Sequence, residues 1–263
     1  MSMSQAKVVF LGTGASTGVP VIGCDCKVCS SDNPKNKRLR PGLLLSCDGK
    51  TFVVDAGPDF REQALSYKIK TPDALFLTHT HYDHIGGLEE FRAFSYHNKV
   101  PIPCYVSRPS FESIQKLYYY LFTPKTDTKN STAQFDFHIL EKSYGEVQVC
   151  GHTIEHFSYV HGGMAVLGYK FGRLAYVTDI KEYTEEVISA LRDIDILILS
   201  ATCLKHSHLH MTVDEAVAFS QKVQPKKTYF VHLGHEIEYE YVSSLLPAGI
   251  SLAYDGHEFE YSW

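Results

Sequence analysis

The chain has 263 residues, of which 44% are hydrophobic and 21% are charged, as in an ordinary soluble globular protein. Its formal net charge of −5 excludes the broad basic surface that is typical of nucleic-acid binding. No apolar run approaches the roughly 18 residues of a membrane-spanning helix, so we expect no membrane contact. Residues 1–263 contain no linker or repeat, and we predict one domain that buries its own core.

Short apolar runs rich in β-branched and aromatic residues predict buried strands along the whole chain. In chain order, the predicted strands cover residues 8–11, 43–46, 51–54, 74–77, 104–106, 174–177, 194–199 and 228–231. The segments between them predict helices over residues 59–67, 88–96, 110–122, 183–192 and 212–222. Thr212 stands three residues before Glu215, which is the capping-box pattern of a helix start. The alternation of strands and helices predicts an α/β fold.

Several predicted strands end next to a side chain that can bind a metal ion. Asp55 and His79 follow two strands of the first half of the chain. Asp179 and His232 follow two strands of the second half. Proteins of the α/β class place their sites at the ends of buried strands. The sequence therefore predicts a functional site at these strand ends.

The densest group of candidate ligands lies between positions 79 and 84. His79 and His81 point to the same side of an extended segment, because side chains alternate with a period of two, so both rings can bind one ion. Asp83 and His84 come where the chain turns into the next helix, and they can face a second ion. Imidazole and carboxylate suit zinc, iron and manganese. A polar loop with hydrogen-bonded histidines is the alternative, but this density of ligands favours a metal site.

The pattern His79-x-His81-x-Asp83-His84 resembles the signature of the metallo-β-lactamase superfamily. The resemblance extends along the chain and implies an αββα sandwich of the metallo-β-lactamase fold, with a dinuclear metal site at one edge. Asp55 matches a carboxylate that supports the metal ligands of that family. By resemblance, the ligands of the first ion are His79, His81, His161 and Asp179. Those of the second ion are Asp83, His84, His232 and Asp179, which bridges both ions.

The resemblance also implies a hydrolase in which two divalent metal ions activate water. Two ions about 3.5–4 Å apart can share a hydroxide and stabilise the attacking and leaving oxygen atoms of a displacement. The family places a catalytic histidine that is not a ligand roughly twenty residues before its last ligand; His210 is the best match and His208 the alternative. We expect Asp83 and His210 to be the catalytic residues, and the ions to be zinc or manganese, or else iron.

Three of the seven cysteines, Cys24, Cys26 and Cys29, stand within six residues. An odd number of cysteines at this spacing suits a metal site in a reducing compartment better than a disulfide framework, so we expect a cytoplasmic protein. A structural zinc takes four ligands, and His235 is the natural fourth. Three buried or reactive cysteines are the alternative reading. Together with Gly12-Thr13-Gly14, the cluster resembles the PhnP-like phosphodiesterase group, whose members carry a structural zinc of this kind.

This second resemblance implies a phosphodiesterase for a small, cyclic or nucleotide-like phosphodiester. The alternatives are a glyoxalase II-like thioester hydrolase and a tRNase Z-like RNA endonuclease, which the acidic net charge disfavours. A non-catalytic metal-binding module would leave the complete ligand set unexplained. Because twofold assemblies are common, we expect a homodimer. The basic residues Lys35, Lys37, Arg38 and Arg40 indicate a solvated loop, or a lip of the active site that attracts phosphate.

Overall fold

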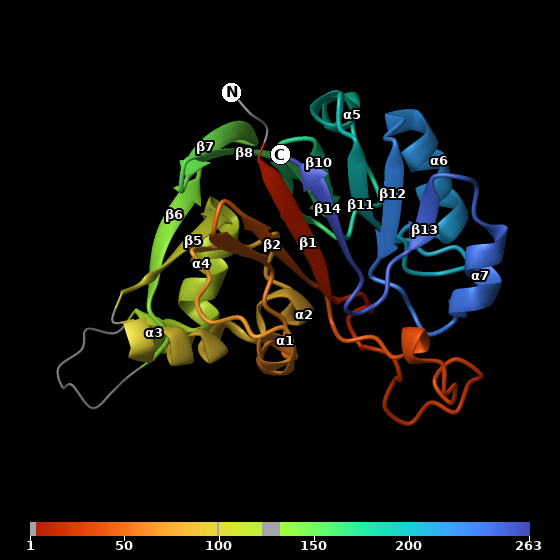
Figure 1. Cartoon of the computed structure of the whole chain (residues 1–263), viewed down its shortest axis with the longest axis horizontal. Helices are drawn as coiled ribbons and strands as arrows, with labels where there is room; N and C mark the ends of the chain where they lie inside the picture. Colours follow the sequence, from red (N-terminus) through yellow and green to blue (C-terminus); the bar gives the residue numbers. More distant parts are fainter. Residues whose placement is uncertain (1–3, 99, 123–131) are drawn as a thin grey trace.

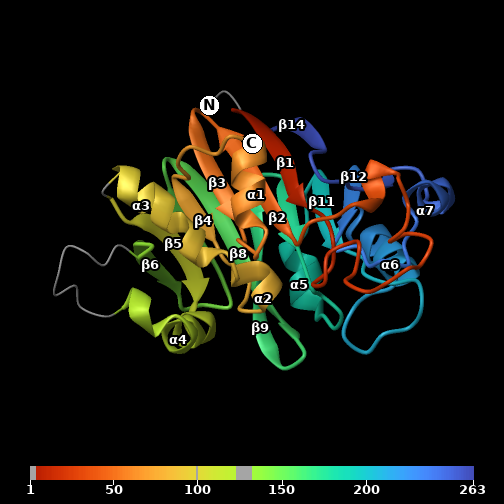
Figure 2. The same ribbon diagram turned by 90° about the horizontal axis from the view of Figure 1, so that it is seen from below.

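The structure is a computed structural model that describes residues 4–98, 100–122 and 132–263. Two seven-stranded sheets pack face to face, and helices cover the outer face of each sheet (Figures 1 and 2). The fold is therefore the predicted αββα sandwich. Among the helices that the structure describes, none is both long enough and apolar enough to cross a membrane.

The first sheet has the strand order β14-β1-β2-β3-β4-β5-β6. Its strands are β1 (Gln5–Gly12), β2 (Gly42–Cys47), β3 (Lys50–Val54), β4 (Ala74–Phe76), β5 (Ile102–Ser107), β6 (Phe135–Leu140) and β14 (Glu258–Ser262). Pairing is antiparallel from β14 to β3 and parallel from β3 to β6. The helices of this half are α1 (Phe60–Ser66), α2 (Tyr82–Ile85), α3 (Arg92–Asn98) and α4 (Arg108–Leu117).

The second sheet repeats this design, with the strand order β13-β12-β11-β10-β9-β8-β7. Its strands are β7 (Tyr144–Val149), β8 (His152–His161), β9 (Met164–Phe171), β10 (Leu174–Val177), β11 (Ile196–Ser200), β12 (Lys227–Val231) and β13 (Ile250–Leu252). Pairing is antiparallel from β7 to β10 and parallel from β10 to β13. The helices are α5 (Glu185–Ala190), α6 (Val213–Val223) and α7 (Tyr239–Leu245).

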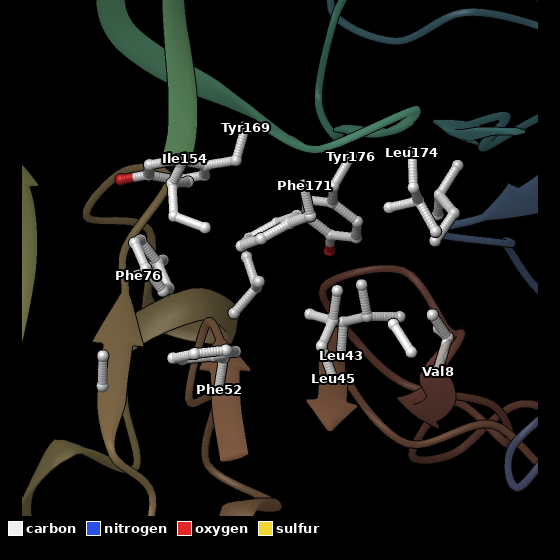
Figure 3. Packing of buried hydrophobic residues seen from close by; sticks show 14 of the residues in the cluster. Val8, Leu43, Leu45, Phe52, Phe76, Ile154, Tyr169, Phe171, Leu174 and Tyr176 are labelled. Atoms are coloured by element: carbon white, nitrogen blue, oxygen red, sulfur yellow. The ribbon is translucent and has the colours of Figure 1, made fainter. Parts of the chain in front are cut away.

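The main core lies between the two sheets, where aromatic and aliphatic side chains from both sheets interdigitate (Figure 3). Strand β2 illustrates how one strand contributes side chains both to the core between the sheets and to the core under the helices. Leu43 and Leu45 point into the core between the sheets, whereas Leu44 packs under the helices of the first half. Because side chains alternate along a strand, one continuous apolar run supplies both cores. These two cores make the sheets a rigid platform for the loops at the strand ends.

The eight predicted strands are all present, with small shifts at their ends, but six further strands were missed. The missed strands are β6, β7, β8, β9, β13 and β14. In β7 and β8, exposed residues are interspersed with partly or fully buried ones, so these segments lack the continuous apolar run on which the prediction relied. The predicted helix 88–96 is divided into a 3₁₀ turn, Leu88–Phe91, followed by α3. Helices α2 and α7 were not predicted as separate elements.

The predicted capping box at the start of α6 is present. The Thr212 hydroxyl accepts a hydrogen bond from the backbone N–H of Glu215 at 3.2 Å, and the Glu215 carboxylate accepts one from the backbone N–H of Thr212 at 2.8 Å. Lys181 donates to the same carboxylate at 2.7 Å. These contacts satisfy two N–H groups at the helix start and fix where the chain leaves the loop that carries His210.

Replacing Thr212 by Ala should lower the free energy of unfolding by about 1 kcal/mol, because the side-chain acceptor for the helix start is lost. Thr212→Ser keeps the oxygen atom and is the matched control. The measurement is urea denaturation of both variants at the same saturating metal concentration. Equal stability of the two variants would contradict a capping role for this hydroxyl.

Candidate dinuclear metal centre and zinc site

The predicted motif lies in the loop after β4 and in the first turn of α2. His81 is the residue before that helix, with extended backbone angles, and Asp83 and His84 lie within the helix. The Nε2 atom of His79 and the Nδ1 atom of His81 are 3.0 Å apart, so the two rings meet as their spacing predicts. His79 and His84 are fully buried, and Asp83 is nearly so.

Three other residues of the centre follow strand ends in the left-handed backbone conformation. The φ angles are 60° for Asp55, 53° for Asp179 and 57° for His232. Such angles are uncommon for residues other than glycine and persist only where the surrounding fold enforces them. Asp55 follows β3, Asp179 follows β10 and His232 follows β12. The backbone thus bends sharply after each of these strands and directs the three side chains toward one another, as expected of a functional site.

Asp179 lies in the middle of the group, and its carboxylate is almost completely buried. Its Oδ2 atom is 2.9 Å from Nε2 of His84 and 3.6 Å from Nε2 of His79. Its Oδ1 atom is 3.3 Å from Nε2 of His232 and also 3.3 Å from Nδ1 of His210. The carboxylate therefore lies next to histidines of both predicted ligand sets, His79 of the first and His84 and His232 of the second, as expected of a carboxylate between two cations.

The remaining predicted ligands lie close to the residues that surround Asp179. Asp83 Oδ2 lies 3.2 Å from Nε2 of His232 and 3.3 Å from Nε2 of His84. The ring of His161 lies 5.5 Å from that of His81, and its ligand nitrogen is within 4.8 Å of the ligand atoms of Asp179 and His210. The structure thus brings together all seven predicted ligand residues, from four separate segments of the chain.

The chemistry of these side chains fits divalent metal ions. Four buried atoms of the group make no hydrogen bond of suitable geometry among the described residues, although charged neighbours lie close to three of them: His84 Nε2, His161 Nδ1, Asp179 Oδ1 and His210 Nδ1. Buried polar atoms are almost always satisfied, so such a convergence is expected where ions bind. Burial acts to raise the pKa of Asp179, but the surrounding histidines, His232 first, outweigh it and hold the pKa well below its usual range. The carboxylate is therefore ionised, as a metal ligand must be.

Hydrogen bonds behind the centre fix the orientation of the rings. Asp55 Oδ2 lies 2.7 Å from Nδ1 of His84, and Asp55 Oδ1 accepts a hydrogen bond from the backbone N–H of Thr78 at 2.8 Å. This is the supporting carboxylate that the resemblance implied. The Thr202 hydroxyl lies 3.2 Å from Nδ1 of His232. Sequence reasoning missed Thr78 and Thr202, although Thr78 adjoins the motif; nothing near Thr202 in the sequence marks its role.

Among the three histidines before α6, only His210 reaches the centre. Its side chain is 24% exposed, and its ring stacks on that of His232 with 5.4 Å between centroids. His206 and His208 are exposed and contact each other. The structure therefore favours His210 over His208 as the histidine next to the metal ligands.

The cysteine cluster and His235 form a second, separate group. The Sγ atoms of Cys24, Cys26 and Cys29 lie 3.3, 3.6 and 3.7 Å from Nδ1 of His235. In a tetrahedral zinc site with metal–ligand distances of about 2.0–2.3 Å, neighbouring ligand atoms are roughly 3.5 Å apart. Hydrogen bonds, the largest from the backbone of Cys29, lower the pKa of the Cys26 thiol to about 6. The geometry and the thiolate both fit zinc.

For Arg38 the prediction of a solvated loop or an open lip is wrong, because its side chain is only 2% exposed, whereas Lys37 of the same stretch is exposed. Its guanidinium donates hydrogen bonds to the carbonyl oxygens of Gly234 and Ile237 at 3.0 and 2.7 Å. These carbonyls flank His235. Figures 1 and 2 both show the long loop between β1 and β2 lying beside α7 and the segment before it. Arg38 thus connects the cysteine loop with the loop that carries His232.

The family described as beta-lactamase superfamily domain matches residues 50–233, and the chain belongs to the metallo-β-lactamase superfamily. Within it, the chain falls in the PhnP-like group. It is 36% identical to a solved structure described as a new diphosphatase from the PhnP family. The similarity covers 98% of this chain and 97% of the other, with a TM-score of 0.89. Both the superfamily and the group agree with the resemblances in the sequence.

Of two other relatives, the first is more distant in sequence and the second is a longer protein. Zinc-bound PqqB from Methylobacterium extorquens is 21% identical, with a TM-score of 0.78 over 96% of this chain and 99% of that one, and shares the fold. An octanoyltransferase from Porphyromonas gingivalis is 33% identical over 96% of this chain and 51% of its own length. The chain thus spans about half the length of that curated relative. The residues of the site, in a member of this superfamily, fit divalent metal ions.

Cys26→Ser should reduce the metal content of the purified protein from about three to about two ions per chain, because a serine hydroxyl is a poor zinc ligand. Elemental analysis after desalting measures this change. Cys203→Ser, at a cysteine outside the cluster, should keep the full content. An undiminished zinc content in the Cys26 variant would contradict the structural zinc.

Proposed function

We propose that the chain is a phosphodiesterase that cleaves a small phosphodiester with two divalent ions, zinc or manganese, or else iron. The position of Asp179 carries the proposal, because its carboxylate lies next to His79 of the first predicted ligand set and next to His84 and His232 of the second. In this proposal, one ion binds to His79, His81, His161 and Asp179. The other binds to Asp83, His84, His232 and Asp179. When bound, two such ions supply acidified water as the nucleophile and neutralise charge on the phosphate.

His210 is suited to donate a proton to the departing oxygen atom. It lies at the rim of the centre, where its ring is partly exposed and close to Asp179. Stacking on His232 holds the plane of the ring. A histidine in this position can protonate the leaving alkoxide, a contribution of typically 10²–10⁴-fold to the rate. Asp83, whose Oδ2 atom lies 3.2 Å from Nε2 of His232, would complete the ligand set of the second ion.

A hollow of about 450 Å³ beside the centre supports a small substrate. Thr80, which precedes His81, and Gly162, which follows His161, both line it. Ser113 also lines the hollow and is partly exposed, whereas Ser110 is almost completely buried. The Ser113 hydroxyl can hydrogen-bond to a substrate in this hollow. The similarity to the PhnP-family diphosphatase supports attack on phosphorus as well.

Hydrolysis of an acyl thioester or ester is the second candidate. The specific observation that favours it is the relative named octanoyltransferase, whose name refers to an acyl group. The match covers 51% of that protein, so the acyl transfer in its name can belong either to the half that matches this chain or to the other half. An RNA endonuclease is disfavoured by the net charge of −5, because contacts to many phosphates require Lys and Arg.

His210→Ala should lower kcat on the best phosphodiester by about 10²–10⁴-fold, because the proton donor is removed while the metal ligands stay. Metal content should stay at the wild-type level. His208→Ala, an exposed histidine of the same loop, is the matched control and should keep its rate. Wild-type kcat in the His210 variant would remove this residue from the mechanism.

The two candidate reactions are separated by measuring turnover of bis(p-nitrophenyl) phosphate and of an S-acyl thioester with added Mn²⁺ or Zn²⁺. We expect the phosphodiester to be cleaved faster, because two adjacent ions can stabilise both the attacking and the leaving oxygen atom of a displacement at phosphorus. Cleavage of the thioester alone would overturn the phosphodiesterase proposal and establish the second candidate. Metal loading with no turnover of either would argue against both.

A further inference from the structure

Three further side chains with metal-binding atoms lie together far from both sites described above. Cys47 ends β2, Asp48 begins the turn to β3, and His152 begins β8. His161 of the dinuclear centre is at the other end of β8, and ten residues of strand span roughly 30 Å. Figure 1 shows both chain termini at one end of the sandwich and α2 at the other. The three residues belong to the end with the termini, because Trp263 packs on His152.

We propose that Cys47, Asp48 and His152 form an additional binding site for a divalent ion of the zinc type, separate from the dinuclear centre and from the cysteine–histidine site. One sulfur, one nitrogen and one oxygen atom are a ligand set that zinc accepts. Sulfur and imidazole disfavour magnesium and calcium, which prefer oxygen ligands. Three protein ligands leave a fourth position for water.

The geometry needs little adjustment to accept such an ion. The ligand atoms of the three side chains all lie within 4.8 Å of one another. Nε2 of His152 is 3.8 Å from Oδ2 of Asp48, compared with roughly 3.3 Å between two such atoms on a tetrahedral zinc. The side chain of Asp48 is 57% exposed and can rotate to close this gap. Its present partner, the hydroxyl of Ser4 at 2.6 Å, is also exposed to solvent.

Packing holds the other two ligands in place. The ring of His152 lies between aromatic neighbours, 4.6 Å from Trp263 and 5.9 Å from Phe52 between centroids. Cys47 is only 2% exposed and belongs to the core between the sheets. Ligands fixed in advance by packing lose little entropy when an ion binds. The site is therefore preorganised at two of its three positions.

The site would connect the two sheets, because Cys47 and Asp48 belong to the first sheet and His152 to the second. Its exposed carboxylate and water ligand make the ion exchangeable, unlike the ions that remain through desalting. An ion that binds only the folded chain stabilises it in proportion to the logarithm of its concentration. Added zinc should thus raise the melting temperature of protein whose other sites are already full.

The test uses the full chain after loading and desalting, titrated with Zn²⁺ by calorimetry and followed by thermal unfolding. Wild-type protein should bind one further equivalent and melt at a higher temperature. Loss of even an outer partner of a metal ligand weakens binding about 10–100-fold, so Asp48→Asn and His152→Ala should raise the Kd at least about tenfold. Asp48 is exposed and has a φ of 49°, which Asn tolerates, so this variant should fold.

Cys150→Ser is the matched control, because this exposed cysteine lies in the neighbouring turn before β8 and outside the cluster. It should bind the further equivalent like wild type. Turnover of bis(p-nitrophenyl) phosphate should be the same in all variants, which separates this site from the proposed function. Equal binding of additional zinc by wild type, Asp48→Asn and His152→Ala would overturn the proposal, as would the absence of a further equivalent in wild type.

Discussion

An ionised carboxylate that is buried away from water must be surrounded by groups that compensate its charge, and Asp179 imposes this constraint on the fold. Burial alone would raise its pKa, but the neighbouring histidines outweigh that effect. His84 approaches one oxygen atom from α2, while His232 approaches the other from the end of β12. The two halves of the sandwich therefore meet at this carboxylate. Divalent ions would compensate the charge more completely, and the atoms that lack hydrogen bonds are placed for them.

The two sheets explain how such an arrangement is held. Asp55, Asp179 and His232 all adopt left-handed backbone conformations directly after a strand. Strain of about 1–3 kcal/mol per residue is tolerated only where the surroundings are well determined. The core between the two sheets provides this support, because its aromatic and aliphatic side chains pack against the strands and hold the strand ends in position. Catalytic geometry and core packing are thus linked through a few residues of backbone.

The cysteine loop extends this support to the other side of the centre. His232 and His235 are three residues apart, so a zinc ion bound to His235 would also restrict His232. Arg38 reinforces the connection through hydrogen bonds to carbonyl oxygens of the same segment. Its burial lowers the pKa of the guanidinium to about 10, yet the side chain stays charged at neutral pH. The proposed zinc site and a buried cation would thus act on the same loop, which carries His232.

The sequence by itself determined the features whose parts are close along the chain. Neighbouring residues have directions that the backbone geometry fixes, so the motif from His79 to His84 and the capping box at Thr212 could be predicted. Apolar runs determined the central strands, but half-exposed strands such as β8 gave too weak a pattern. Only tertiary structure decided that His210 reaches Asp179 and that Arg38 is buried. Contacts between residues that are far apart in the sequence depend on how the sheets pack, and no local pattern encodes that packing.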